Sequence, residues 1–366
     1  MRFLRVALVS LSLLAVPSAV FAHASYVLTH DEYASAFTDL QVSFVDALYY
    51  PENVALFFAL ALVVSILLIA NFLFRHSAIG RRIDDGVEKV AWIAPIIIRV
   101  SLGLLFLFAG MAGRFFGPEL PLGAFAGGEG IRFLLIFLSG LLLVGLWTEI
   151  AALLGGILYL IGLMQVGLYM LVYAPVLGAC TILFLWGSRH FSLDRYLEGH
   201  DKKSDCSLML SPVVLRIFFG ATLIYSGILI KVAHPAVALA VVEKYRLTEL
   251  IPFVSDPLLF VFLCALIEIG VGIFILIGFE MRLMLLVSLV TTALSLLYFR
   301  ELLWPHILLV GTALALLVSH DDRFTIDTFF DHHGLLRISR KKEKEALSAR
   351  LPILPHSKQH LLRHRV

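Results

Sequence analysis

Charged residues are scarce in this sequence. Only 15% of its 366 residues are Asp, Glu, Lys or Arg, whereas 60% are hydrophobic, and the mean hydropathy is +0.93. A water-soluble globule of this size needs more polar residues than that to cover its surface. The composition therefore excludes a soluble protein and predicts one that lies in a membrane.

Cysteine is scarce as well. Cys180, Cys206 and Cys264 lie far apart and form no C-x-x-C pair, which excludes a disulfide framework and a thioredoxin-type redox site. We find no phosphate-binding loop, dinucleotide fingerprint, zinc-protease helix or nucleophile elbow. Nothing points to nucleic acid beyond a basic C-terminal segment.

The N-terminal residues 1–22 have the pattern of a secretory signal: a basic start, an apolar run and a small-residue exit. We exclude them from the fold and assign residues 23–52 to a short exported segment; an uncleaved anchor is the alternative. Cleavage after Ala22 would expose His23, which could chelate copper with a second imidazole such as His30. Two histidines are thin support, so we predict no metal site.

Long apolar runs dominate the rest of the chain. Runs of about 17 to 23 residues can cross a hydrocarbon core of about 30 Å. Nine such runs are expected, at 53–74, 91–112, 131–148, 150–167, 171–187, 212–233, 257–278, 283–299 and 302–319. The sequence therefore predicts an all-α, polytopic membrane helix bundle that contacts the lipid bilayer, with tight hairpins where successive runs almost touch.

The cations indicate an orientation. Residues 23–53 contain no Lys or Arg, whereas loops 75–90 and 188–211 and the segment from 320 onward are rich in them. Because cytoplasmic loops carry an excess of Lys and Arg, we expect the N-terminus outside and the C-terminus in the cytoplasm of a prokaryote, across its inner membrane. Residues 53–90 would then be an extra transmembrane helix with a cytoplasmic loop, and 329–366 a basic cytoplasmic tail.

The sequence also repeats itself. RVSLGLLFLFAGMAGRF and RIFFGATLIYSGILIKV share a register of cations and glycines: Arg99/Arg216, Gly103/Gly220, Gly110/Gly227 and Arg114/Lys231. WGSRHFSLDRYL is echoed by VSHDDRFTIDTFF, and Glu149 and Glu280 are expected in the same tight turn. The pattern predicts two four-helix units, 91–195 and 212–328, that lie parallel in the membrane.

A four-helix unit that opens with R-x3-G-x6-G-x3-R/K resembles the DoxX family of small prokaryotic membrane proteins. The second copy fits better, because IEIGVGIFILIGFE resembles the family's second helix, with an acid followed by glycines. The first copy, FLSGLLLVGLWTE, lacks that acid. The resemblance implies two tandem DoxX-like units. Some members serve as the quinone-linked membrane subunit of thiosulfate oxidation, and others accompany thiol-redox or oxidative-stress proteins.

Glu268 is the sharpest candidate for chemistry. It falls near the middle of a membrane span, where an acid costs at least about 2.5 kcal/mol on insertion scales, so it should face the interior. Counting the helical rise places Tyr225, Glu268 and His306 at comparable depths. Such a polar layer could bind quinone and exchange its protons, with Glu268 as the catalytic acid. The alternative is a neutral acid that joins helices by a hydrogen bond.

The repeated cations and glycines have simpler interpretations. Arg99 and Arg216 can snorkel to head groups or form ion pairs with Glu149 and Glu280 within each repeat. Gly103, Gly110, Gly220 and Gly227 are expected to let helix backbones approach closely.

Three functions fit these observations. The first is a membrane redox subunit that binds quinone, without a covalent cofactor, and receives electrons from a separate partner protein. The second is a non-catalytic scaffold that holds partner proteins at the membrane. The third, a small-solute transporter, is weakened by the scarcity of polar pore residues.

Overall fold

The computed structural model describes residues 28, 31–32, 35–36, 44–75, 77–187, 191–198, 205–250, 254–319 and 324–327. The chain divides into two compact parts, Met1–Asp322 and Arg323–Val366, and each is considered by itself. The expected signal at 1–22, His23 and the basic tail at 329–366 lie outside the described residues. The helices below all belong to Met1–Asp322.

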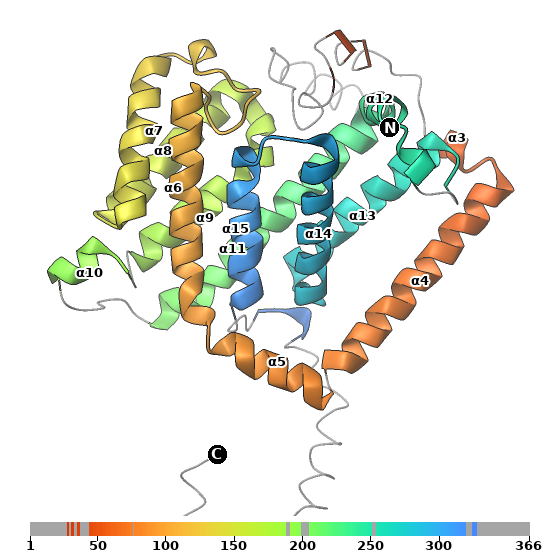
Figure 1. Ribbon diagram of the computed structural model, residues 1–366, viewed down its shortest axis with the longest axis horizontal. Helices are drawn as coiled ribbons and strands as arrows, with labels where there is room; N and C mark the ends of the chain where they lie inside the picture. Colours follow the sequence, from red (N-terminus) through yellow and green to blue (C-terminus); the bar gives the residue numbers. More distant parts are fainter. Residues whose placement is uncertain are drawn as a thin grey trace, which may run out of the picture. The chain divides into compact units, whose positions relative to one another are not determined.

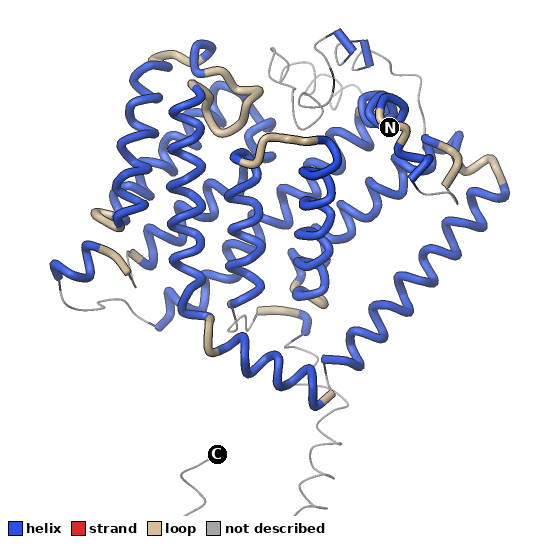
Figure 2. Tube along the Cα trace, in the orientation of Figure 1, coloured by secondary structure: helices blue, strands red, loops and turns tan. Residues whose placement is uncertain are grey.

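The described residues form helices joined by loops and turns (Figure 2), which confirms the expected all-α class. The α-helices, labelled in Figure 1, are α3 Phe44–Ala47, α4 Pro51–Arg75, α5 Ala78–Glu88, α6 Ala94–Ala112, α7 Gly128–Val144, α8 Thr148–Val166, α9 Ala174–Trp186, α10 Leu193–Glu198, α11 Asp205–Ser226, α12 Pro235–Lys244, α13 Pro257–Ile277, α14 Met281–Phe299 and α15 Ile307–Val318. Short 3₁₀ turns are η2 Ala91–Ile93, η3 Leu122–Ala124, η4 Gly167–Tyr173, η6 Leu247–Leu250 and η7 Trp304–His306; η5, Gly227–Ala233, is a π-helical turn.

Two sets of four helices carry most of the fold; we call α6–α9 the first group, and α11 with α13–α15 the second group. Within each group the second and third helices are joined by a tight turn that opens with a glycine in the left-handed region. Gly145 (φ 72°) ends α7 and Gly278 (φ 69°) ends α13. A side chain strains that backbone conformation, whereas glycine adopts it freely and satisfies the last helical carbonyls.

Glycines bring the first two helices of each group close together. In the first group, Gly103 packs against Leu143 and Gly110 against Ile136. In the second group, Gly220 packs against Leu276 and Gly227 against Ile269. An added Cβ would lie only 2.7 to 3.0 Å from the nearest atom at these four positions. The missing side chains therefore set the separation of α6 from α7 and of α11 from α13.

The two groups also pack on each other through their first and last helices. Helix α9 contacts α11, and α15 contacts α6. Both contacts are close, because Gly178 of α9 touches Phe218 and Gly311 of α15 touches Ser101. These crossings join the groups into one hydrophobic core.

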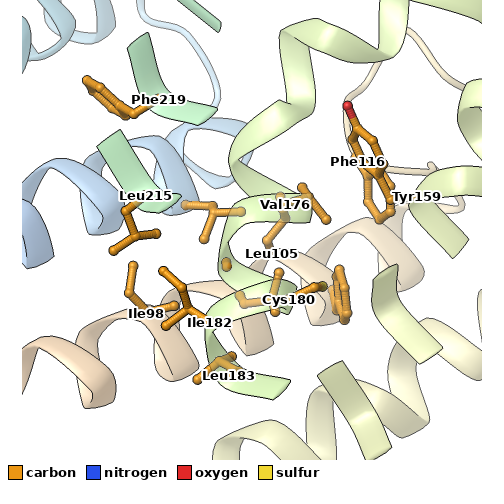
Figure 3. Close-up of a cluster of buried hydrophobic side chains, with 14 of the residues drawn as sticks. Ile98, Leu105, Phe116, Tyr159, Val176, Cys180, Ile182, Leu183, Leu215 and Phe219 are labelled. Atoms are coloured by element: carbon orange, nitrogen blue, oxygen red, sulfur yellow. The ribbon is translucent and has the colours of Figure 1, made fainter. Parts of the chain in front are cut away.

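That core lies where α6, α9 and α11 meet (Figure 3). The fully or almost fully buried side chains drawn there include Ile98, Leu105, Ile182, Leu215 and Phe219. Around the outer loop of the first group, Phe116 stacks near Phe106 with ring centroids 5.8 Å apart and extends the core. In a bilayer such tight packing holds helices together by van der Waals contact, since lipid tails are as apolar as the side chains.

Helix α4 differs from the others because none of its most apolar window is buried within the protein. It is attached at both ends. At its start, Asn53 donates hydrogen bonds to the Ala47 carbonyl (2.9 Å) and to Asp256 (2.7 Å). At its end, Asn71 hydrogen-bonds Glu280, and Arg75 lies 3.6 Å from the same carboxylate.

Within the described residues, six helical segments are long and apolar enough to cross a membrane: Pro51–Arg75, Ala91–Ala112, Thr148–Trp186, Pro212–Ala233, Pro257–Ile277 and Met281–Phe299. Thr148–Trp186 contains both α8 and α9. The expected runs 131–148 and 302–319 correspond to the shorter helices α7, of 17 residues, and α15, of 12. Several apolar spans imply contact with lipid, whereas the count of nine stays a prediction.

Candidate functional site

The site begins where α11 changes its winding. After Ser226 the chain continues as the π-helical turn Gly227–Ala233, and Pro235 then starts α12. Proline lacks the N–H that a continuing helix needs, so the long helix ends there. Wide π-helical turns are rare and often lie at functional sites. Lys231 lies in this turn.

Lys231 forms an ion pair with Glu268 of α13. Gly227 brings the two helices together one residue away from the acid, at Ile269. The side chains of Lys231 and Glu268 keep 25% and 22% of their surface exposed, so a molecule outside the bundle can reach them. A charged pair within apolar membrane helices is costly and is a functional candidate for that reason.

A thiol lies beside the pair. Cys264 is one helical turn before Glu268 on α13, so the two side chains share a face of the helix. Cys264 is a free cysteine, and both charges of the ion pair act on it. The site thus combines an ammonium group, a carboxylate and a thiol.

The three side chains of the expected polar layer have different surroundings. No hydrogen bond joins any two of Tyr225, Glu268 and His306 in the described part of the chain. Glu268 pairs with Lys231 instead. Tyr225 packs against the hydrophobic core. The helical rise gives depth but not the direction in which a side chain points, and direction separates these residues.

His306 belongs to a second polar cluster. Its Nε2 lies 3.3 Å from Glu301, and its Nδ1 lies 3.2 Å from the Leu302 carbonyl oxygen. Because a carbonyl only accepts hydrogen bonds, Nδ1 carries a proton, and a hydrogen bond between Nε2 and Glu301 needs a second proton. Together with Tyr173, the imidazole lines a cavity of about 40 Å³ between the two groups. That volume suits water rather than a larger ligand.

The repeated arginines lie inside the protein. Arg99 and Arg216 are each only 4% exposed, which argues against the snorkelling interpretation. Arg99 donates to the Phe191 carbonyl oxygen at 2.6 Å. The FSLD segment that contains Phe191 also caps α8, because Asp194 accepts from the backbone N–H groups of Trp147 (2.8 Å) and Thr148 (3.2 Å).

Glu149 and Glu280 do not occupy equivalent positions. This corrects the expectation that both lie in the same tight turn. Glu280 precedes α14 in a left-handed conformation (φ 47°), and the residue with that role before α8 is Trp147 (φ 48°). Glu149 lies two residues later and is exposed, whereas Glu280 is completely buried. Glu280 contacts Asn71 and Arg75, partners from α4 that the repeat pattern could not indicate.

No cluster of three or more metal-ligating side chains occurs among the residues that the structure describes. The sequence reasoning missed Glu301 and did not recognise Lys231 as the partner of Glu268. The signal for Lys231 was available, because this lysine ends the repeated motif close to a membrane-embedded acid.

Comparison with known families identifies one part of the chain. Residues 211–301 match the model of the DoxX family. This stretch contains Lys231, Cys264, Glu268 and the turn at Glu280, and a second DoxX match in the first group is not found. The search of curated proteins and the search of solved structures give no match. With its apolar helices, the chain is a multi-pass membrane protein, and residues 211–301 are the part that is similar to the DoxX family.

Proposed function

We propose that this protein is a quinone-linked redox subunit of the membrane, and that the quinone head group binds at the Lys231–Glu268 pair. The observation that carries the proposal is this partly exposed ion pair on apolar helices inside the DoxX domain. A quinone is carried in lipid, so it can approach the pair from the bilayer. The ammonium can donate a hydrogen bond to a quinone carbonyl, and the carboxylate can transfer protons.

In this proposal the electrons come from a separate partner protein. Reduction of a quinone to a quinol consumes two electrons and two protons, and the partner supplies the electrons. Glu268 would accept protons from solvent and deliver them to the reduced quinone. The partner is therefore part of the proposal.

The test uses Glu268→Gln, since an amide has the shape of the acid but carries no transferable proton. We expect the purified variant to fold, at lower stability because Lys231 loses its counter-charge, and to lose most quinone reduction with the native partner. Glu243→Gln, on the exposed surface of α12, is the matched control and should keep full activity. Wild-type protein that copurifies with no quinone, or normal turnover in Glu268→Gln, would contradict the proposal.

A non-catalytic scaffold is the second candidate, and α4 favours it. Much of its apolar surface is exposed, with Phe58, Leu62, Ile69 and Leu73 each more than 60% exposed. A helix with so much exposed apolar surface could pack against a partner's membrane helix as well as against lipid. Replacing Leu62 and Ile69 by alanine should release such a partner without changing quinone content.

We also infer that the two groups arose by tandem duplication and lie parallel in the membrane. Three matched contacts support this: Gly103–Leu143 with Gly220–Leu276, Gly110–Ile136 with Gly227–Ile269, and Gly311–Ser101 with Gly178–Phe218. Between matched positions, the residue number rises by 117 from α6 to α11, and by 133 from α7 to α13 and from α9 to α15. The difference corresponds to extra residues between the first and second helices of the second group, where α12 lies. The tandem DoxX assignment of the first group remains part of this proposal.

The proposed orientation in a prokaryotic inner membrane keeps the N-terminus outside. A reporter that is active only outside the cytoplasm should be active when fused near Gly127 and silent when fused after Leu361. The reverse pattern would overturn the orientation but leave the proposed redox role untouched.

A further inference from the structure

Helix α5 connects two membrane spans through very short links. Residues 76 and 77 separate it from α4, and residues 89 and 90 separate it from the span Ala91–Ala112. The end of one span and the start of the next lie at a membrane surface, so the chain length holds α5 at that same surface. Figure 1 shows α5 running across the direction of α6 rather than along it.

Several contacts fix the rotation of α5 about its axis. Ser77 caps its first turn by accepting from the Gly80 N–H at 3.1 Å. Gly80 is pressed against the end of α4, where an added Cβ would lie 2.4 Å from the Phe74 carbonyl oxygen. Arg282 of α14 binds Asp84 on α5. With one side of α5 bound to the bundle, its other faces have defined directions.

One of those faces is apolar and exposed. Ile79 and Ile83 lie one turn apart on the same side of α5, and they are 61% and 49% exposed. Trp92, just after α5, is 45% exposed, and tryptophan is enriched at membrane–water boundaries. The helical period places Asp84, which binds Arg282, on another side of the helix. The helix is therefore amphipathic, with its apolar face left uncovered by the described residues of the protein.

We propose that α5 is an in-plane helix that binds the boundary between lipid head groups and acyl chains, with Ile79 and Ile83 inserted among the chains. Three observations support lipid as the occupant: the covalent links to spans on both sides, the narrow apolar face, and the binding of Asp84 on another side of the helix to the bundle. Amphipathic helices of this kind lie with their apolar face in the acyl boundary. The contact between Asp84 and Arg282 joins α5 to α14. Because α5 follows α4 directly, this contact also holds the end of α4 near the second group at the membrane surface.

The test measures depth with a nitroxide label in liposomes of zwitterionic lipid. Single cysteines are introduced as Ile83→Cys and, as matched control, Asp85→Cys, in a background whose three native cysteines are replaced by alanine. Oxygen concentrates in acyl chains, and a water-soluble nickel complex stays outside them. The oxygen-to-nickel collision ratio should be several-fold higher at position 83 than at position 85.

Equal nickel access at both positions would overturn the proposal, as would equal burial of both, which would indicate a helix sunk in the membrane. A contrast that appears only with anionic lipid would also contradict insertion, because it would show attraction by charge alone. If the cysteine-free background does not fold, p-benzoylphenylalanine at position 83 or 85 of the native chain gives a second measurement. Light should then crosslink lipid from position 83 and much less from position 85.

Discussion

The helix pairs α6–α7 and α11–α13 are built around matched glycines but differ in charge. Where α13 has Glu268 before Ile269, α7 has the completely buried Leu135 before Ile136. Lys231 pairs with Glu268, whereas Arg114, its sequence counterpart, forms no ion pair in the described part of the chain. An apolar residue therefore fills this kind of position well, and packing alone does not explain the acid in the second group.

Burial within the protein differs between the groups too. In the first group, 61% of the most apolar window of Ala91–Ala112 is buried, and the same share holds for Thr148–Trp186. In the second group, the share is 44% for Pro212–Ala233, 28% for α13 and 17% for α14. The first group is thus packed mainly against other parts of the protein, whereas the second group leaves more of its surface to lipid. A lipid-borne ligand or a partner's helix can reach Glu268 from that surface.

The largest expected effect comes from breaking the ion pair that only the second group has. Lys231→Met leaves the Glu268 carboxylate without its partner and should destabilise the protein by about 3 kcal/mol. The double variant Lys231→Met/Glu268→Leu resembles the first group at this position and should recover most of that loss. Thermal unfolding in detergent at constant pH measures all the variants.

Arg114→Met is the matched control for that series, because this arginine forms no ion pair in the described residues. Its stability should stay close to that of the unchanged protein. If Lys231→Met lowered stability no more than Arg114→Met, the Lys231–Glu268 pair would contribute nothing to stability. The difference in charge between the two groups would then have no effect on folding.

A second experiment compares the matched glycines. At Gly220 an added Cβ would meet the Gly272 carbonyl oxygen at 2.7 Å, and backbone cannot move aside easily. At Gly103 the nearest atoms, 3.0 Å away, belong to the flexible side chain of Leu143. We expect Gly220→Ala to cost about 1–3 kcal/mol, and Gly103→Ala to cost less because the gain in helix propensity offsets the crowding. Equal losses of stability in thermal unfolding would contradict this expectation, because they would show that both helix pairs tolerate an added methyl group equally well.

Periodicity and composition were sufficient to predict the helices and the repeated glycines. A span needs a long apolar run, and a close helix crossing needs small residues, so both leave a local pattern. The partners of the charged residues depend instead on non-local geometry. The π-helical turn before α12 sets the direction of Lys231, and α4 supplies Asn71 and Arg75 to Glu280. The repeated motif marks Lys231 but not the direction of its side chain, and no local pattern marks Asn71 or Arg75 as partners of Glu280.

The smallest expected effect concerns the turn that joins α7 to α8 in the first group. Asp194 caps α8 from a distant segment by accepting from the N–H groups of Trp147 and Thr148, which would otherwise lack a partner. Asp194→Ala should therefore cost about 0.5–2 kcal/mol, the range for a lost helix cap. Asp194→Asn keeps one accepting oxygen and should lose less, and Tyr196→Ala, at a side chain 85% exposed, should have little effect. Hydrogen exchange at Trp147 and Thr148 should rise in Asp194→Ala alone. Unchanged exchange there would mean that the turn holds its shape without the FSLD segment, and that the repeated motif has another role.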